Sequence, residues 1–358
     1  MKGGVLVDQI GFGIIGGGMI GPYHAEAIGM IPEAKLIAVA TSREDTAQQF
    51  SEKTNAPHWY VDYRELLKRE DIQVVNICTP PYLHEEMVLA AVAYGKHVLV
   101  EKPMAINLHQ VDAMISACQK AGVELGVIYQ YRFSSAAQKI KKAIDERRLG
   151  KLFLGDAYVK WFRSQQYYES THWRGLWMKE GGGALINQSI HAIDLLQWFM
   201  GPVEWIDGMY QTVNHQIETE DIAVAKLRFM NGSMGVIEGS TAIYPGFPQK
   251  IELHGEKGSI IMEGDEIVFW KLQEPAEPEA LPYPTKKLDT SSSPTAGFSP
   301  EYHRRQIQEF LNAFKENRHP LVDGWEGRKS LEIVRAIYLS SQTGERIHFP
   351  VHEQEGWG

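Results

Sequence analysis

Three consecutive glycines, 16–18, follow a short apolar run at residues 10–15 and precede a stretch with helical periodicity. With Gly21 they complete the spacing Gly-x-Gly-x-x-Gly. The first glycine permits a tight strand-to-helix turn, the second lets backbone N–H groups approach a pyrophosphate, and the third lets the helix lie close to the strand. The helix N-terminus adds N–H donors and partial positive charge. The predicted dinucleotide contacts in this turn are Gly16, Gly18, Met19 and Ile20.

The pattern of the next hundred residues favours this interpretation over an ordinary glycine-rich turn. Short apolar segments at 35–41, 72–78 and 97–100 alternate with amphipathic helical patterns. Continuous apolar strands separated by helices are typical of a parallel sheet that is covered on both faces. We therefore predict an N-terminal Rossmann domain, a doubly wound parallel sheet, over residues 1–131.

The pattern changes near residue 131. From 203 to 271 strands follow one another directly, with hairpin signals at 229–233 and 255–258. Such strands pair mostly antiparallel. We predict an α/β chain in which residues 132–358 form a C-terminal α+β domain, with an open, mostly antiparallel sheet, for substrate binding and oligomerisation. The other elements predicted here are helices at 185–200, 302–317 and 326–341 and a proline-rich surface loop at 274–300.

Composition limits the possible partners and compartments. A chain of 358 residues favours two domains. A net charge of −9 argues against nucleic acid and acidic membrane surfaces as partners. Cys78 and Cys118 both lie in apolar segments, so no disulfide framework is expected. No apolar stretch is long enough to span a bilayer and the first residues lack a signal-peptide core. We predict a cytoplasmic protein without a metal site.

One group of candidate residues follows the predicted parallel strands. The segments Thr79-Pro80 and Glu101-Lys102-Pro103 lie just past strand ends, at the sheet edge that binds ligands in open α/β folds. A solvated surface lysine is the alternative for Lys102, but its position after a buried strand favours the site. His84 either lines the cofactor or caps a helix. The predicted cofactor contacts at this edge are Thr79, Pro80, His84, Glu101 and Lys102.

A second group follows the glycine triplet 181–183. Asn187 and His191 are four residues apart and share one helix face, beside an apolar stripe that belongs to the core. A lone buried histidine is usually a core residue, but a polar pair after a glycine run is typical of a site wall. Asp194 is interpreted as structural.

The residues after the second strand bear on the choice of dinucleotide. The acidic ribose reader of NAD enzymes is expected near Thr41, where the sequence instead reads Thr41-Ser42-Arg43. A serine and an arginine can hold a 2′-phosphate that an acid would repel. The alternative is that Arg43 merely starts a helix. We favour NADP and leave NAD open, with Thr41, Ser42 and Arg43 as contacts.

Aromatic and arginine side chains gather between residues 131 and 177. Aromatic faces stack on sugar rings, and guanidinium groups bond hydroxyls or carboxylates. Half-exposed loop aromatics are the alternative. We expect the substrate pocket between the two domains. The predicted substrate contacts are Lys102, Tyr131, Arg163, Trp173, Arg174, Trp177, Asn187 and His191.

The glycine turn, Glu101-Lys102-Pro103 and the helix of Asn187 and His191 together resemble the Gfo/Idh/MocA oxidoreductases over nearly the whole chain. The resemblance implies that Lys102 and His191 are catalytic, and we count Asn187 with them in the predicted catalytic group. The family's usual aspartate falls on Asn187, which can bond a sugar hydroxyl but cannot act as a carboxylate base. Some sugar-nucleotide members resemble this chain in carrying asparagine there. The resemblance also implies a homo-oligomer, a dimer or tetramer, formed through the second sheet.

These residues suit the oxidation of a secondary alcohol. The nicotinamide accepts hydride, His191 accepts the hydroxyl proton, and Lys102 orients the hydroxyl and stabilises charge on its oxygen. The predicted activity is NAD(P)-dependent hydride transfer at a hydroxyl carbon of a sugar, cyclitol or sugar derivative. The alternatives are a glycosidase that uses bound nicotinamide for transient oxidation and a dinucleotide-sensing regulator without catalysis.

Overall fold

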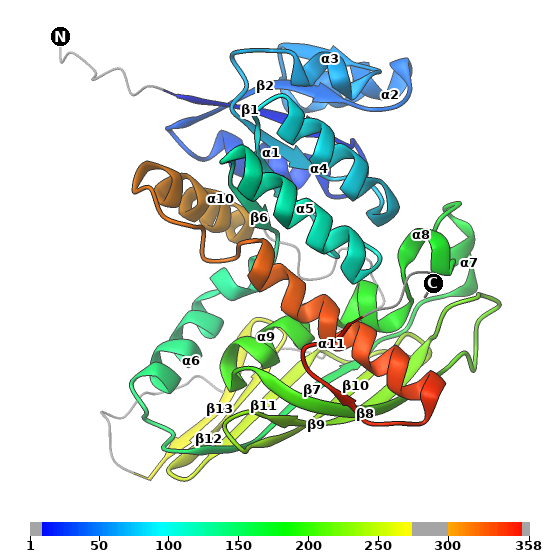
Figure 1. Cartoon of the computed structure of the whole chain (residues 1–358), viewed down its shortest axis with the longest axis vertical. Coiled ribbons are helices and arrows are strands. Elements are labelled where there is room, and N and C mark those ends of the chain that lie inside the picture. Colours follow the sequence, from blue (N-terminus) through cyan, green and yellow to red (C-terminus); the bar gives the residue numbers. More distant parts are fainter. Residues whose placement is uncertain (1–8, 274–299, 353–358) are drawn as a thin grey trace. The chain divides into compact units, whose positions relative to one another are not determined.

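The computed structural model describes residues 9–273 and 300–352 (Figure 1). Two compact units divide the described residues. The first contains 9–105, 109–130 and 300–327, and the second contains 106–108, 131–273 and 328–352. The surface loop predicted at 274–300 lies, except for its last residue, outside the described residues.

A six-stranded parallel sheet forms the first unit, with the strand order β3-β2-β1-β4-β5-β6. Its strands are β1 (Ile10–Ile15), β2 (Ala34–Ala40), β3 (His58–Tyr60), β4 (Val74–Ile77), β5 (His97–Val100) and β6 (Leu125–Val127). The prediction of a Rossmann sheet is confirmed. The order reverses between β1 and β4, and ligands bind at this switch point in open α/β sheets.

Helices and a closing segment cover this sheet. The helices are α1 (Gly21–Gly29), α2 (Glu44–Thr54), α3 (Tyr63–Leu67), α4 (His84–Ala93), α5 (Leu108–Ala121) and α10 (Pro300–Lys315). From α10, Ile307 and Phe310 join a core cluster with Phe12 and Ile14 of β1. The residues 300–327 thus belong to the first unit, although the sequence boundaries placed them in the second domain.

An eight-stranded sheet forms the second unit, in the order β13-β12-β11-β7-β10-β9-β8-β14. Only the β7–β10 pair is parallel among the described neighbours, so the prediction of a mostly antiparallel sheet is confirmed. Its strands are β7 (Leu152–Lys160), β8 (Val203–Gln211), β9 (Ile222–Phe229), β10 (Met234–Ser240), β11 (Lys250–Gly255), β12 (Gly258–Glu263), β13 (Glu266–Leu272) and β14 (Ile347–His348).

The two faces of this sheet differ. Burial alternates along β9, as expected for a sheet with one covered face. Helix α9 (Ile190–Met200) packs against β7 and β11 on the covered face (Figure 1). The register aligns Met209, Val224, Glu238 and Tyr158 in one row on the other face, where Met209 is 60% and Val224 44% exposed.

The helices of the second unit differ from the predicted ones in two respects. Its other helices are α6 (Ser135–Asp145), α7 (Gln165–Glu169), α8 (Trp177–Glu180), the π-helix η3 (Ala184–Ser189) and α11 (Gly324–Thr343), which begins in the first unit. The continuous α-helix predicted at 185–200 was wrong in its first turns, which are π-helical. The short helices α7 and α8 were missed because four or five residues carry too little periodicity.

Across the described ranges, every helix is too short or too polar to cross a membrane.

Candidate functional site

The glycine turn joins β1 to α1 at the carboxyl edge of the first sheet. Gly16 has a φ of 109°, and a Cβ there would come within 2.6 Å of the Cys78 carbonyl. A Cβ on Gly21 would lie 2.3 Å from the carbonyl oxygen of Gly16. Gly18 and Met19 are exposed, and α1 has neither a side-chain cap nor an acidic residue in its first turn. The turn therefore fits a dinucleotide pyrophosphate at the helix N-terminus.

The segment after β2 presents a cation where a ribose reader is expected. The Thr41 hydroxyl donates to the carbonyl oxygen of Arg43 at 3.0 Å, and Arg43 begins α2 as its N-cap residue. The Arg43 side chain is 69% exposed, and its Nε lies 3.4 Å from Asp45 Oδ1. Such an exposed pair contributes little stability. The guanidinium is thus accessible to a phosphate.

His84 connects the loops that follow β4 and β5. Its ring is buried, with Nε2 2.8 Å from the Thr79 carbonyl oxygen and Nδ1 3.0 Å from that of Pro103. Burial lowers the pKa of His84, which favours the neutral ring. A neutral imidazole has one N–H, so the ring donates to one of these carbonyl oxygens and only packs against the other. His84 therefore lies between the two loops that carry the other predicted residues. Its role as a cofactor contact stays a prediction.

Glu101 is the carboxylate of a buried cluster just after β5. Its Oε1 accepts from His24 Nε2 at 2.9 Å, and its Oε2 accepts the backbone N–H of Lys102 at 3.1 Å. Asn76 contacts the other nitrogen of His24 at 2.8 Å. Burial raises the pKa of Glu101, but the imidazoles of His24 and His303 outweigh it and hold the pKa below its usual range. The cluster fixes the backbone that carries the half-buried Lys102.

Another buried carboxylate, Glu220, holds the start of the π-helix in the second unit. Its Oε2 accepts the N–H of Gly183 at 2.7 Å, and its Oε1 accepts the N–H of Leu185 and the hydroxyl of Tyr338, both at 2.8 Å. A Cβ on Gly183 would lie 2.0 Å from the backbone oxygen of Glu220, so this glycine permits the approach. Burial raises the pKa of Glu220 to about 7.

The π-helix carries Asn187 and leads into α9, which carries His191. The Ser189 hydroxyl donates to the Ala184 carbonyl oxygen, five residues back, at 2.9 Å. This side-chain bond supports the wide turn that replaces the expected α-helical one, and π-turns are frequent at functional sites. The half-buried Asn187 and the buried His191 stay one helical turn apart.

Asn187 and His191 each have a defined neighbour within the second unit. The Nδ2 of Asn187 donates to Glu180 Oε1, and Glu180 Oε2 accepts the N–H of Gly175 at 2.5 Å. The ring of His191 meets that of Tyr131 edge-on, with centroids 4.9 Å apart. The structure thus brings together two predicted site residues, Tyr131 and His191, and adds Glu180, which sequence analysis missed.

A buried ion pair fixes the segment after Tyr131 to the helix of His191. Arg132 donates from Nε to Asp194 Oδ2 at 2.8 Å and from a terminal nitrogen to Oδ1 at 2.7 Å. The Ser330 hydroxyl adds a bond to Asp194 Oδ1 at 2.8 Å. A bidentate, hydrogen-bonded pair of this kind sets position more than stability. Asp194 is therefore structural, as interpreted from the sequence.

Two predicted arginines flank one tyrosine ring. The guanidinium of Arg174 lies 4.1 Å and that of Arg163 5.4 Å from the Tyr167 centroid, and Arg174 also lies 5.2 Å from the Trp173 ring. The Tyr167 hydroxyl accepts from Gln188 of the π-helix at 3.0 Å. These are cation–π contacts within the second unit. Substrate contact by Arg163, Trp173 and Arg174 stays a prediction.

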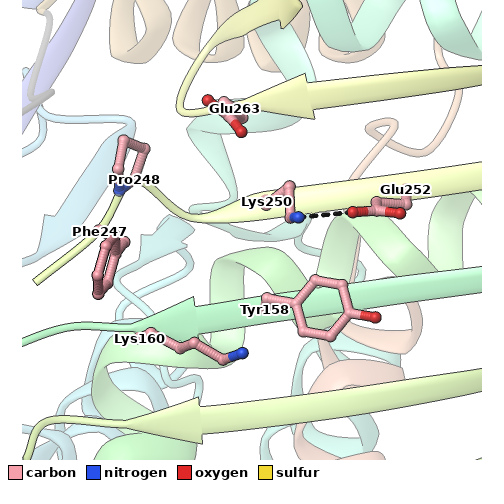
Figure 2. A pocket seen from close by; sticks show the side chains of 7 residues that line it. All are labelled: Tyr158, Lys160, Phe247, Pro248, Lys250, Glu252 and Glu263. Carbon is pink, nitrogen blue, oxygen red and sulfur yellow. Dashed lines mark ion pairs between the residues drawn. The ribbon is translucent and has the colours of Figure 1, made fainter. Parts of the chain in front are cut away.

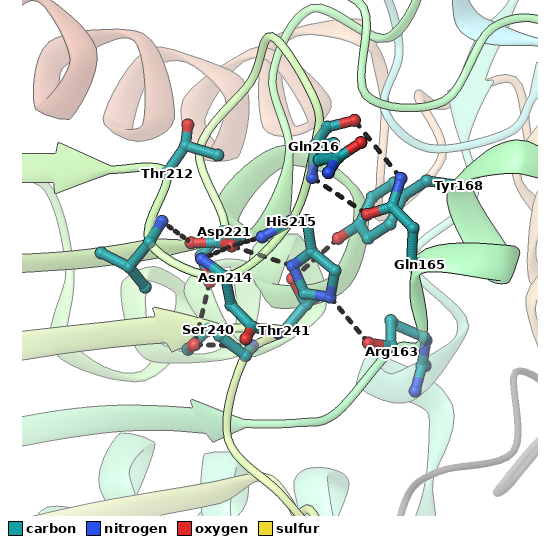
Figure 3. Close-up of polar contacts among 12 residues, drawn as sticks. Arg163, Gln165, Tyr168, Thr212, Asn214, His215, Gln216, Asp221, Ser240 and Thr241 are labelled. Atoms are coloured by element: carbon teal, nitrogen blue, oxygen red, sulfur yellow. Dashed lines mark hydrogen bonds and ion pairs between the residues drawn. The ribbon is translucent and has the colours of Figure 1, made fainter.

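A polar network holds the backbone at Arg163 (Figure 3). His215 bonds Asp221 Oδ2 through Nδ1 at 2.8 Å and the Arg163 carbonyl oxygen through Nε2 at 2.7 Å. Burial works against the charged ring, but the bond to Asp221 raises the pKa of His215. The ring of Tyr168 lies 4.9 Å from that of His215. The network anchors the segment of Arg163 to the 212–221 loop.

Trp177 lies in an aromatic cluster of the same unit. Its ring is 5.2 Å from that of Tyr338 and 5.7 Å from that of Tyr210, edge-on in both cases, and its Nε1 donates to the Glu218 carbonyl oxygen at 2.9 Å. These contacts explain its position through packing. Substrate contact by Trp177 stays a prediction.

The side chains that position Asn187 and His191 were not predicted from the sequence. Glu180, Gln188 and Glu220 are buried and contact the π-helix or its residues. Glu180 directly precedes the glycine triplet, and this acidic residue beside three glycines could have indicated a side chain that belongs to the site. Glu220 lies 37 residues beyond Gly183, so no local pattern connects them.

Two other features lie apart from these residues. A pocket on the half-exposed face of the second sheet is lined by Tyr158, Lys160, Phe247, Pro248, Lys250, Glu252 and Glu263 (Figure 2). It contains none of the predicted site residues. Among the residues that the structure describes, two groups have metal-ligand atoms within 4.8 Å of one another: His24 with Glu101 and His303, and Asp156 with Glu252 and His254. In the first group, hydrogen bonding already accounts for the proximity of His24 and Glu101.

The parallel sheet and the glycine turn define a Rossmann unit, and the comparison with known families identifies an NAD-binding oxidoreductase. Residues 10–129 match the model of an oxidoreductase family with an NAD-binding Rossmann fold, and residues 137–261 match the GFO/IDH/MocA C-terminal domain. The chain belongs to the Gfo/Idh/MocA family of oxidoreductases, which confirms the resemblance inferred from the sequence.

Several relatives match nearly the full length. The chain is 29% identical over 352 residues to myo-inositol 2-dehydrogenase of Thermotoga maritima, covering 93% of this chain and 99% of the relative. It is 28% identical to scyllo-inositol 2-dehydrogenase (NAD(+)) of Bacillus subtilis, covering 97% and 98%. The crystal structure of the WlbA dehydrogenase from Bordetella pertussis with NADH and UDP-GlcNAcA is similar with a TM-score of 0.85 and 32% identity, covering 96% of this chain and 100% of that chain.

Proposed function

We propose that this oxidoreductase transfers hydride between NAD(P) and a hydroxyl carbon of a sugar, cyclitol or sugar derivative. The observation that carries the proposal is the helix that presents Asn187 and His191, with His191 packed against Tyr131, in a chain whose other unit has the glycine turn. The full-length relatives named as inositol dehydrogenases support the substrate class.

Three residues handle the reacting hydroxyl in this proposal. When bound, the nicotinamide accepts hydride from the carbon. His191 takes the hydroxyl proton, because an imidazole titrates near neutral pH. Lys102 orients the hydroxyl and stabilises negative charge on its oxygen. Asn187 bonds the substrate without acting as a base. The remaining predicted substrate contacts are Tyr131, Arg163, Trp173, Arg174 and Trp177.

The residues that surround the dinucleotide follow the strand ends of the first unit. The proposed contacts are Gly16, Gly18, Met19, Ile20, Thr79, Pro80, His84, Glu101 and Lys102, with Thr41, Ser42 and Arg43 at the ribose. We propose a preference for NADP because the accessible Arg43 guanidinium can pair with a 2′-phosphate. Arg43→Ala should raise the KM for NADP about tenfold and leave that for NAD within about twofold. An equal change for both dinucleotides would contradict the preference.

The same proposal divides the chain into a dinucleotide-binding domain and a substrate-binding domain. It also places the protein in the cytoplasm, which is consistent with the buried thiols Cys78 and Cys118. It further includes a homo-oligomer formed through the half-exposed face of the second sheet, where Met209 and Val224 share a row with Tyr158. Light scattering should show a dimer or tetramer that Val224→Asp dissociates. A monomeric wild type would contradict it.

A substrate panel tests the central proposal. The purified chain is mixed with myo-inositol, scyllo-inositol, levoglucosan or UDP-GlcNAcA and with NAD or NADP, and absorbance of the reduced nicotinamide is followed. We expect turnover with at least one member of the panel. Release of free sugar from a glycoside with no net dinucleotide turnover would favour the glycosidase instead. Dinucleotide binding without turnover of any substrate would favour the regulator.

A further inference from the structure

We propose that Glu180 is a positioning residue that holds the amide of Asn187 in one orientation, so that its carbonyl oxygen faces the substrate hydroxyl. The inference rests on the proposed function, because it gives Glu180 a task at the same site. Glu180 is 1% exposed and ends α8, directly before the glycine triplet. Two hydrogen bonds, one from a backbone N–H and one from a side chain, reach its carboxylate.

Both carboxylate oxygens of Glu180 accept hydrogen bonds. Oε2 accepts the backbone N–H of Gly175 at 2.5 Å, and Oε1 accepts from Nδ2 of Asn187. An ionised carboxylate has no proton to donate, so the amide must turn its NH₂ toward it. The two ends of an asparagine amide are otherwise nearly the same in shape. Glu180 therefore selects the orientation in which Oδ1 of Asn187 points away from it and accepts from a substrate hydroxyl.

The same contact explains the amide at position 187. An aspartate there would place a second carboxylate against the buried Glu180, and two such groups cannot both ionise without a large cost. One carboxylate and one amide instead satisfy both the contact between the two side chains and the bond from the N–H of Gly175. The exchange of the two groups, with the amide at 180 and the carboxylate at 187, would satisfy them equally.

The charge state of Glu180 gives the pair a measurable pH dependence. Burial raises its pKa to about 7, while the bonds from Gly175 and Asn187 favour the ionised form. Of the charged groups that act on it, Arg174 favours ionisation and Glu220 opposes it. Tyr167 also faces this carboxylate. The acceptor orientation of Asn187 should therefore become more populated as the pH rises through neutrality.

Glu180→Gln tests the orientation because the introduced side chain has nearly the same shape. The N–H of Gly175 still requires an acceptor, so the introduced carbonyl takes that bond and the introduced NH₂ faces Asn187. Asn187 must then reverse and present a donor to the substrate. We expect the KM of the best sugar in the panel to rise about tenfold, with the KM for dinucleotide and the melting temperature near wild type. The rise of kcat/KM through neutral pH should weaken.

The exchange of groups supplies the rescue. Asn187→Asp alone should raise the KM for the sugar and lower the melting temperature more at pH 8 than at pH 6. Combined with Glu180→Gln, it should return the KM to within about threefold of wild type, because the introduced amide now donates to the introduced carboxylate. Glu218→Gln is the matched control, because Glu218 contacts α8 through the N–H of Trp177 and is exposed. It should leave both KM values unchanged.

Additive losses in the double variant, or an unchanged KM in Glu180→Gln, would overturn the inference. The proposed function is tested separately, and it fails if the wild type binds dinucleotide but turns over no sugar. In that case the contact between Glu180 and Asn187 is tested by the unfolding midpoints of the wild type, the two single variants and the double variant. Recovery of stability in the double variant would support the fixed amide, and additive destabilisation would refute it.

Discussion

The two units position their candidate residues by different means. In the first, the residues follow strand ends of a sheet buried on both faces, and glycines shape the turn; β1 is buried along five of its six residues. In the second, the helix that carries Asn187 and His191 is held by Glu180 and Glu220, two carboxylates from other segments. Strand ends and glycine spacing are local features of a sequence, whereas contacts between distant side chains are not.

The largest expected effect comes from removing one proton-handling group in each unit. Lys102→Ala and His191→Ala should each lower kcat about 10³-fold, because general acid–base groups contribute about 10² to 10⁴ in rate. Dinucleotide affinity, measured by fluorescence titration, should stay within about threefold of wild type in His191→Ala and fall only modestly in Lys102→Ala, because Lys102 is one of many proposed dinucleotide contacts. Near wild-type turnover in one variant would assign proton handling to the other unit alone.

A smaller effect, on stability, should separate the glycines of the two units. Gly183→Ala should destabilise the protein by about 3 kcal/mol, because the added Cβ would lie 2.0 Å from the Glu220 backbone oxygen. Gly29→Ala at the end of α1 is the control, since its Cβ would meet no heavy atom within 4 Å. Chemical denaturation should show no loss for the control. Equal midpoints for both variants would contradict the packing described at Gly183.

This contrast explains how much the sequence could predict. The parallel and antiparallel sheets follow from periodicity, and so do the positions of Gly16 and Lys102 just past the ends of β1 and β5. The π-turn could not be predicted in this way, because Glu220, which holds its start, lies 35 residues from Leu185 in sequence. The position of α10 in the first unit could not be predicted either, since an amphipathic helix does not specify which sheet it covers.

The buried carboxylates should give the units opposite pH responses. The pKa of Glu220 is raised to about 7 in the fold, so the folded state binds more protons than the unfolded state between about pH 4.5 and 7. Its stabilising contribution is therefore lost as the pH rises through 7. The pKa of Glu101 is lowered, so its contribution is lost only on acidification below the unfolded value.

The unfolding free energy of the wild type should decrease between pH 5 and 8, and Glu220→Gln should make this decrease smaller by about 2 kcal/mol. Denaturant titration at each pH measures both. Glu101→Gln should instead cost stability at pH 8 and have less effect on acidification below the unfolded pKa of the carboxyl. The same slope in the wild type and in Glu220→Gln would contradict the raised pKa.

The smallest expected effect concerns the open part of the glycine turn. A Cβ on Gly18 would meet no heavy atom within 4 Å. Gly18→Ala should therefore change the unfolding free energy by less than about 0.5 kcal/mol. It should still weaken dinucleotide binding about tenfold, or about 1.4 kcal/mol, because a methyl group would keep the pyrophosphate from the backbone. Unchanged affinity in calorimetry would place the dinucleotide elsewhere.

The return of the chain to the first unit has a consequence for biosynthesis. Gln306 of α10 donates to the Val127 carbonyl oxygen at 2.7 Å and accepts the N–H of Tyr129 at 3.1 Å, next to the edge strand β6. Val322 accepts the N–H of Val127 at 3.0 Å. A ribosome must therefore release more than 320 residues before the nucleotide-binding sheet can gain its last partners. Residues 131–273 of the second unit emerge earlier, so the part translated first must wait for a large inserted segment before its own sheet is complete.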